Sequence, residues 1–376
     1  LLVVIIIGIY MKFNINRDVL LPVLQTVSGV VDRRQTLPIL SNILFNIEEN
    51  SLKITATDME VELIVEISTE LNLSGLITLP AKKLLDICRA LPQKAELDFE
   101  IKKERVLIKS GKSRFTLASL PGQEYPSIDI TEKTTSFKIS QKRFEMLLEN
   151  TQFAMAQQDV RYYLNGLLLE ISQNKIKAIA TDGHRLAIDE TEIQLDAKEL
   201  VQIIVPRKGI TELTRILQGG DSEIEVQIST NHIRIKKGNI CFTSKLIDGR
   251  FPDYERVIPE LSETPVLANR EELRNSLTRA SILSNEKYRG VRIIFDTNSL
   301  KALAHNPEQE EAEEELEVDY SGVEIEIGFN VSYLLDTLSI IKSEKVKLSI
   351  LNPNSSCLLL PEDDTNCQYV VMPMRL

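Results

Sequence analysis

One hairpin pattern occurs three times in this chain of 376 residues, at intervals of 124 residues. The copies read SNILFNIEENSLKITATD, LNGLLLEISQNKIKAIATD and GVRIIFDTNSLKALAHN, and their turn asparagines keep the same interval: Asn50, Asn174 and Asn298. Solenoid units are about 20–50 residues long, so a repeat of this length predicts three copies of a whole domain. The chain is long enough for three domains of about 120 residues, each with its own core. We therefore expect function to depend on how three copies are arranged.

Each copy is expected to contain a helix, a hairpin, a second helix and further strands. Apolar residues recur at helical spacing in six segments, and Asn or Ser begins the first helix of each copy. These segments are residues 16–31, 80–91, 140–155, 206–217, 269–283 and 330–343. Pro80 and Pro206 are expected in the first turns of their helices. The element order predicts an α+β fold of three tandem similar domains, each built from two similar halves.

Domain boundaries are expected near residues 131–136 and 259–265, which are rich in polar residues or proline. They divide the chain into domains at residues 11–133, 134–258 and 259–376. The first ten residues are apolar but too short to cross a bilayer, and they lack the flank and cleavage site of a signal peptide. Met11 is expected to be the true start, with residues 1–10 a non-native or upstream extension. No other stretch is predicted to span a membrane.

Charge is distributed unevenly along the chain. The formal net charge is −11, which argues against indiscriminate binding of nucleic acid, yet the six helical segments together carry +5. Helix faces are often rich in lysine, so the difference can be an ordinary solvated surface. It can also be a positive helical surface that faces a polyanion, with an acidic exterior elsewhere.

The two ends of the chain also differ in charge. GKSRFTLAS is expected to form a short basic strand with Lys112 and Arg114, whereas NPEQEEAEEELEVDY is a run of glutamates. A solvated acidic loop would explain the second segment. The alternative is a head-to-tail contact between chains, which generates a closed ring if the rotation closes.

No motif for catalysis, a metal or a cofactor is recognisable. The cysteines form no CxxC pair, which favours a reducing cytosol: Cys88, Cys241, Cys357 and Cys367. The segment TDGHR at residues 181–185 could suggest a nucleophile and a base, but the other copies have TDMEV and HNPEQ there. It is therefore expected to end a strand. GKSR lacks the upstream glycine of a phosphate-binding loop.

Long strings carry a resemblance to a known family: RQTLPILSN, QDVRYYLNG, ATDGHRLA, SKLIDGRFPDYERVIPE, ILSNEKYRGVR, NPEQEEAEE and YVVMPMRL. From Met11 to Leu376 the chain resembles the bacterial sliding clamp, the β subunit of DNA polymerase III. The resemblance implies a DNA clamp fold in which two chains form a six-domain ring, with helices inside and sheets outside. It also implies a cytoplasmic processivity factor that encircles DNA and tethers the polymerase, without catalysis, metal or cofactor.

The resemblance implies four kinds of partner and no membrane. They are double-stranded DNA of any sequence, a second copy of the chain, the catalytic and clamp-loader subunits of DNA polymerase III, and other polymerases and repair proteins with a clamp-binding peptide. The implied DNA contacts are Arg34, Lys82, Gln158, Tyr162 and Tyr163. The two basic residues would pair with phosphates. The tyrosines would lie against the backbone or a single strand, although ordinary strand packing is an alternative for them.

Two further sets of residues follow from the resemblance. The implied partner-peptide pocket comprises Leu164, Thr181, Gly183, His184, Arg185, Leu186, Pro252, Arg256, Val257, Ser356, Val370, Val371, Met372, Pro373, Met374 and Arg375. The implied dimer interface comprises Lys112, Arg114, Phe115, Leu117, Ile282, Leu283, Glu308, Glu310, Glu311, Glu313 and Glu314. For the C-terminal VVMPM, a terminal edge strand is the simpler interpretation. Rival functions are a metal-dependent nuclease or phosphotransferase and a scaffold that binds only proteins.

Overall fold

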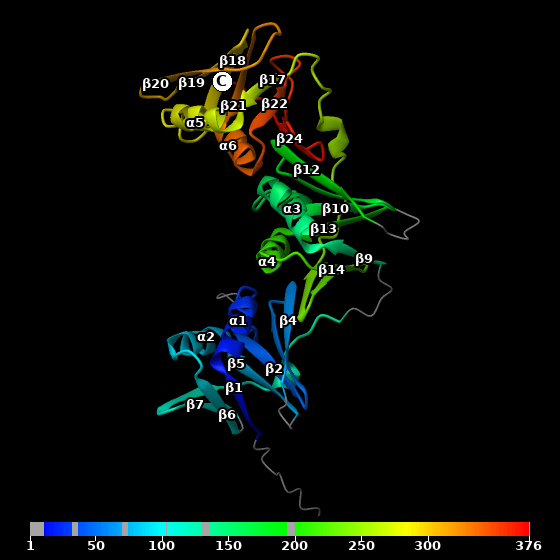
Figure 1. The fold of residues 1–376 in the computed structure, drawn as a ribbon, viewed down its shortest axis with the longest axis vertical. Helices are drawn as coiled ribbons and strands as arrows, with labels where there is room; N and C mark the ends of the chain where they lie inside the picture. The colour runs from blue at the N-terminus through cyan, green and yellow to red at the C-terminus, as the bar shows by residue number, and fades with distance from the viewer. Residues whose placement is uncertain are drawn as a thin grey trace, which may run out of the picture. The chain divides into compact units, whose positions relative to one another are not determined.

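The computed structural model describes residues 11–31, 37–69, 74–102, 104–129, 135–193 and 200–375. All six predicted helices are present (Figure 1). They are α1 (Arg17–Val27), α2 (Ala81–Ala90), α3 (Gln141–Thr151), α4 (Arg207–Leu217), α5 (Arg270–Ser281) and α6 (Val331–Ile340). Among the described residues, no helix is long and apolar enough to cross a membrane.

The strands repeat in the same order three times. The first copy contributes β1 (Met11–Asn16), β2 (Asn42–Glu48), β3 (Ser51–Thr57), β4 (Val61–Ser68), β5 (Gly75–Pro80), β6 (Glu96–Lys102), β7 (Arg105–Ser110) and β8 (Ser113–Ala118). The second contributes β9 (Thr135–Ser140), β10 (Gly166–Ile171), β11 (Lys175–Thr181), β12 (Arg185–Glu192), β13 (Val201–Pro206), β14 (Glu223–Ile228), β15 (His232–Lys237) and β16 (Ile240–Lys245). The third contributes β17 (Val266–Asn269), β18 (Gly290–Asp296), β19 (Ser299–His305), β20 (Glu311–Glu317), β21 (Ile325–Asn330), β22 (Lys345–Ser349), β23 (Cys357–Pro361) and β24 (Cys367–Val371).

The three predicted hairpins are confirmed as antiparallel pairs, β2 with β3, β10 with β11 and β18 with β19. Asn298 adopts a positive φ of 54°, a turn conformation that asparagine tolerates better than most residues. In every copy one helix follows the first strand and the other follows the fifth, so the predicted order and the α+β class are confirmed.

Helix starts agree with the predicted caps in two of the first helices. The side chain of Asn16 accepts a bond from the Asp18 amide, and Asn269 accepts bonds from the amides of Glu271 and Glu272. The expectation for Pro80 and Pro206 is wrong. Each proline ends the strand before the helix, because it is still paired in the sheet, opposite Asn42 and Gly166 respectively.

The chain divides into two compact units that do not follow the repeats. The first combines the described residues of 1–141 with 215–245, and the second combines 142–214 with those of 246–376. Each unit contains one sheet of four strands and one of eight. Each eight-stranded sheet therefore joins strands from two successive copies.

The first unit contains the sheets β1-β6-β7-β8 and β5-β2-β3-β4-β16-β15-β14-β9. Helices α1 and α2 contact each other, and α1 packs on β3 and β4 (Figure 1). Phe13 and Phe99 stack at 4.6 Å between ring centroids, and Phe45 lies 6.2 Å from Phe99. Since these rings come from β1, β6 and β2, they join the two sheets in one core.

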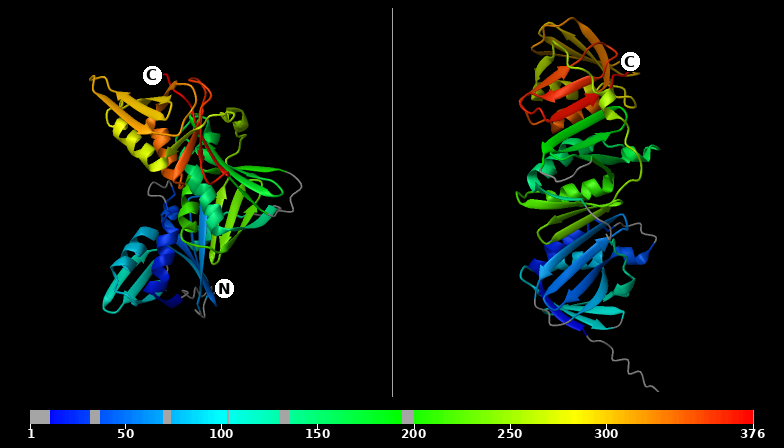
Figure 2. Two further views of the ribbon diagram at one scale, coloured as in Figure 1. Left: turned by 45° about the horizontal axis from the view of Figure 1, so that its top comes forward. Right: turned by 90° about the vertical axis from the view of Figure 1, so that its right-hand side faces the viewer.

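The second unit contains the sheets β13-β10-β11-β12-β24-β23-β22-β17 and β20-β19-β18-β21. Helices α5 and α6 pack side by side, and α5 also contacts β18, β19 and β20 (Figure 2). Buried Phe295 and Phe329 of β18 and β21 fill the core of the smaller sheet.

Two strand pairs connect successive copies within these units. The first junction is β4 with β16, and the second junction is β12 with β24. They are equivalent by repeat order, because β4, β12 and β20 are the fourth strands of their copies, and β8, β16 and β24 are the last. The same backbone bond closes both, from Lys245 N to Glu60 O at 2.8 Å and from Met372 N to His184 O at 2.9 Å.

Candidate functional site

The second junction brings together apolar residues of the predicted peptide pocket. Leu186 of β12 lies opposite Val370 of β24, which lies opposite Leu358 of β23. All three belong to a buried cluster that also contains Leu164, Phe251 and Tyr254. Leu358, Phe251 and Tyr254 were missed from sequence, although Phe251 and Tyr254 flank the predicted Pro252. The cluster itself is buried, and its accessible margin is formed by the half-buried Tyr163, Ile247, Ile258 and Leu360, which suit the apolar side chains of a peptide.

A tight turn between β11 and β12 borders this cluster, as expected for TDGHR. Gly183 has a φ of +89°, which favours glycine, and its amide donates to Thr181 Oγ1 at 3.0 Å. A side chain here would also approach the Arg161 guanidinium within 3.0 Å. The turn is a surface feature that follows a strand, so the structural prediction for this segment is confirmed.

Arg185 is fixed in place beside the cluster. Its guanidinium donates to Asp182 at 3.1 Å, to Asp336 at 2.5 Å and to the carbonyl of Phe153 at 2.9 Å. It also lies 4.8 Å from the ring centre of Tyr333, whose pKa is raised by burial. The His184 ring stacks on Tyr333 at 6.0 Å. Such a pre-ordered rim reduces the entropy lost when a ligand binds.

The loop 157–161 is stabilised by a second charged pair. Arg161 donates to Asp159 through Nε at 3.0 Å and Nη2 at 2.8 Å. These bonds lower the pKa of Asp159 to about 2. Because Arg161 also bonds the carbonyl of Asp182 at 3.1 Å, it links this loop to the Thr181–Arg185 turn.

The C-terminal segment is an interior strand, so the edge-strand interpretation is wrong. β24 pairs with β12 on one side and β23 on the other, and Val370 and Val371 are buried. The reason is the pairing of β12 with a strand more than 170 residues later, which periodicity cannot reveal. Beyond β24, Met372, Pro373 and Met374 are half-buried and Arg375 is exposed.

The remaining pocket residues lie on loops of the second unit. Pro252 precedes a 3-10 turn at Tyr254–Val257, where Arg256 and Val257 are exposed. Arg256 pairs with Asp253 at 2.6 Å, a surface ion pair of little energetic weight. Ser356, just before β23, is half-buried.

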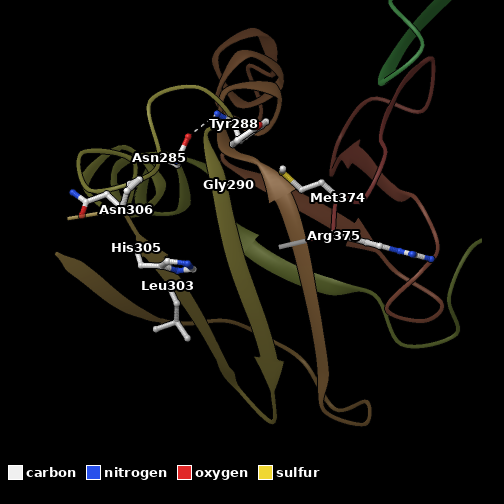
Figure 3. Close-up of a pocket in the computed structure, with 9 residues that line it drawn as sticks. Asn285, Tyr288, Gly290, Leu303, His305, Asn306, Met374 and Arg375 are labelled. Carbon is white, nitrogen blue, oxygen red and sulfur yellow. Dashed lines mark hydrogen bonds between the residues drawn. The ribbon is translucent and has the colours of Figure 1, made fainter. Parts of the chain in front are cut away.

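Met374 and Arg375 line a separate cavity of about 370 Å³ (Figure 3). Its other walls are Asn285, Tyr288, Gly290, Leu303, His305, Asn306 and Pro307. Met374 is held there by a bond from its amide to the carbonyl of Gly328 at 2.8 Å. These walls come from β18, β19 and the α5–β18 and β19–β20 connections, and no sequence pattern indicates that they meet the C-terminal residues.

The predicted DNA contacts are divided between the units. In the first unit Lys82 is exposed on α2, and Arg34 lies outside the described residues. In the second unit Gln158 is exposed with φ of 57°, and Tyr162 is 57% exposed. Strand packing is wrong for both tyrosines, which lie in a 3-10 turn at Tyr162–Asn165. Only Tyr163 packs against the apolar cluster of the second junction.

The predicted interface residues lie at two open sheet edges. β8 is the last strand of one four-stranded sheet and carries exposed Arg114, with Lys112 in the turn before it and Phe115 and Leu117 along it. β20 is the last strand of the other, and it replaces the solvated loop that one interpretation of the glutamate run proposed. Glu311 and Glu313 are exposed on β20, and Glu308 and Glu310 precede it.

The remaining predicted interface residues are Ile282 and Leu283, which follow α5, and Glu314 of β20. Ile282, just after α5, is 73% exposed, and its neighbour Leu283 is half-buried. Glu314 bonds Arg279 of α5 at 2.9 Å, which lowers the pKa of Glu314. Glu314 is therefore held by its own chain, whereas Glu311 is exposed and Glu313, 4.0 Å from Lys301, keeps a side chain that is 64% exposed.

Within the part of the chain that the structure describes, no three His, Cys, Asp or Glu residues are close enough to hold a metal ion. The thiols are poor nucleophiles, because burial raises the pKa of Cys88 to about 11 and that of Cys367 to about 12.

Comparison with known proteins identifies the fold. Family models of the DNA polymerase III beta subunit match residues 11–129 with its N-terminal domain, 138–253 with its central domain and 255–375 with its C-terminal domain. The chain belongs to this family. It is 49% identical over 367 residues to the beta sliding clamp of Pseudomonas aeruginosa, covering 97% of this chain and all of that one.

Solved structures agree with this assignment. A DNA polymerase sliding clamp from Pseudomonas aeruginosa with ligand superposes with a TM-score of 0.95 at 48% identity, covering 97% of this chain and 100% of that chain. A sliding clamp from the same species bound to griselimycin gives a TM-score of 0.94 at 48% identity, with 98% and 100% covered. The chain has the DNA clamp fold and is a sliding clamp, a processivity factor of DNA polymerase III without catalysis of its own.

Proposed function

We propose that two copies of this chain close a six-domain ring around duplex DNA. The observation that carries this proposal is the repeat order of the junctions. The fourth strand of copy one (β4) pairs with the last strand of copy two (β16). The fourth strand of copy two (β12) pairs with the last strand of copy three (β24). The fourth strand of copy three, β20, and the last strand of copy one, β8, are open edges. A second chain can supply the missing partner for each edge, which gives a closed dimer with two seams.

The register of the existing junctions specifies the seam. Leu63 lies opposite Phe242 in the first junction, and Ala187 lies opposite Tyr369 in the second. Counted along their sheets, Ala312 and Phe115 occupy these positions in β20 and β8. The antiparallel pairing then sets Glu313 opposite Arg114 and Glu311 opposite Thr116 of the other chain. Ile282 and Leu283 would bury their apolar surface at the same seam.

DNA inside the ring would pass residues that contact it independently of its base sequence. Arg34 and Lys82 would neutralise phosphates, and Gln158, Tyr162 and Tyr163 would contact the backbone or a single strand. Exposed Lys82 and Tyr162 support this role. The three copies, proposed as domains at 11–133, 134–258 and 259–376, each contribute two helices to the lining.

The second junction is proposed to bind partner peptides through apolar anchors. The exposed Val257 and the half-buried Met372 support this assignment as accessible apolar contacts, and the buried Leu164, Leu186 and Val370 form the apolar core of the same junction. The partners are the catalytic and clamp-loader subunits of DNA polymerase III and other polymerases and repair proteins with such a peptide. Their common compartment is the cytoplasm. Griselimycin is bound by a sliding clamp of Pseudomonas aeruginosa. We propose that it binds this chain at the second junction, and it serves as the probe of that site.

Topology provides the direct test of the ring. Protein loaded onto nicked circular DNA should stay bound in a gel-filtration column and be released when the circle is cut, because a ring slides off a linear end. Equal retention on circular and linear DNA would contradict encirclement.

Lys82→Ala should lower the slope of log affinity against log salt by about 1 on any DNA sequence.

A further inference from the structure

The two junctions share a backbone but differ at three equivalent positions. At the second junction Leu186, Val370 and Leu358 are consecutive cross-strand neighbours, the apolar triad. At the first junction the same positions in β4, β16 and β15 hold Glu62, Thr243 and Arg234, the polar triad. The equivalence follows from the register, since Ser244 pairs with Val61 as Val371 pairs with Arg185.

The turns beside the two triads are also alike. Met59 has a φ of +75° and its amide donates to Thr57 Oγ1 at 3.0 Å, just as Gly183 has a φ of +89° and donates to Thr181 Oγ1 at 3.0 Å. The backbone of these turns therefore does not distinguish the junctions, whereas the side chains of the triads do.

The polar triad anchors the segment that follows the first copy's last strand. Buried Glu62 accepts the Ile128 amide at 3.0 Å. Arg234 donates to Thr243 Oγ1 at 3.1 Å and to the Ile128 carbonyl at 3.3 Å. Both backbone groups of Ile128 are thus held by the triad. A cavity of about 210 Å³ remains beside it, lined by Met59, Pro126, His232 and Lys245 among others.

We infer that the polar triad restricts partner peptides to the second junction, with Glu62 as the specificity-determining residue. An apolar anchor at the first junction would break the hydrogen bonds that join Ile128 to Glu62 and Arg234, and it would leave the buried Glu62 carboxylate without that partner, which is strongly unfavourable. It would also have to displace Ile128. The same anchor at the second junction breaks no side-chain hydrogen bond of the apolar triad, because its three side chains are hydrocarbon. Each chain therefore has one peptide site, at the second junction, although the same strand pairing also occurs at the first junction.

This inference rests on the proposed peptide site at the second junction. The probe is griselimycin, and the readout is the number bound per chain by isothermal titration calorimetry. The wild-type protein should bind one, whereas Glu62→Leu with Thr243→Val and Arg234→Leu should bind two. The isosteric Glu62→Gln, which keeps an acceptor for Ile128, should bind one. A folded triple variant that binds only one would overturn the inference. No binding by wild-type protein would instead defeat the proposed peptide site.

A second measurement covers a triple variant that does not fold. Hydrogen exchange at the Ile128 amide should be at least tenfold faster in Glu62→Leu than in wild-type protein, and little changed in Glu62→Gln. Unchanged exchange in Glu62→Leu would show that Glu62 does not hold this segment, and would overturn the inference as well.

Discussion

The second junction and the two open edges are built from equivalent strands but carry different side chains. Leu186 and Val370 face each other at the second junction, and both are buried. At the edges the equivalent positions hold Glu311 and Thr116, which are exposed and lie close to the exposed charges of Glu313 and Arg114. Apolar pairs suit a joint that stays closed inside one chain. Charged pairs at a solvent-exposed edge contribute less and discourage wrong pairing, as expected for a joint that must open to admit DNA.

The largest expected effect comes from removing the apolar part of the seam. Ile282→Ala with Leu283→Ala should convert dimers into monomers, because each side chain contributes on the order of 1–3 kcal/mol to association. Sedimentation at nanomolar concentration measures this directly. Val323→Ala, which shortens another exposed apolar residue of the second unit, is the control and should leave dimers intact. A double variant that remains fully dimeric would contradict the seam.

Deleting Met372 to Leu376 tests the other side of the comparison. It removes part of the proposed peptide surface but leaves both open edges unchanged. Griselimycin affinity should fall by roughly thirtyfold, the loss of about 2 kcal/mol typical of a binding hot spot, while the protein still dimerises. Loss of dimerisation with unchanged griselimycin binding would assign the C-terminus to the seam instead.

Local features could be predicted from the sequence, and distant pairings could not. The Asn50, Asn174 and Asn298 hairpins and all six helices follow from turn chemistry and periodicity, which act over a few residues. The interior position of β24 depends on its pairing with β12. The first residues of the two strands, Arg185 and Cys367, are 182 residues apart in the sequence. The matches of Glu62 with Leu186 and of Arg234 with Leu358 are visible in the 124-residue repeat spacing. That of Thr243 with Val370 is not, because the loop before the last strand is longer in the third copy and only the register aligns them.

A charge exchange sharpens the proposed register of the seam. Arg114→Glu and Glu313→Arg should each weaken dimerisation by about tenfold, because like charges would then face each other at both seams. The double variant should recover most of the affinity, which a double-mutant cycle measures. Arg105→Glu makes the same charge change on β7, an interior strand of the same sheet, and should have little effect. Failure of the double variant to recover would place Glu313 and Arg114 away from each other.

The smallest expected effect is that of salt, and it separates the two kinds of joint. Raising the ionic strength from about 0.1 M to 1 M shortens the Debye length from about 10 Å to about 3 Å, which screens exposed charges. Dimer affinity should therefore fall several-fold. A variant with Arg114→Gln and Glu313→Gln should respond less, because its seam has lost the charged pair that salt screens. Griselimycin affinity at the apolar second junction should change less still. If salt weakened griselimycin binding as much as dimerisation, charge would matter equally at both joints, and the contrast between a permanent and an opening joint would have to rest on apolar contacts alone.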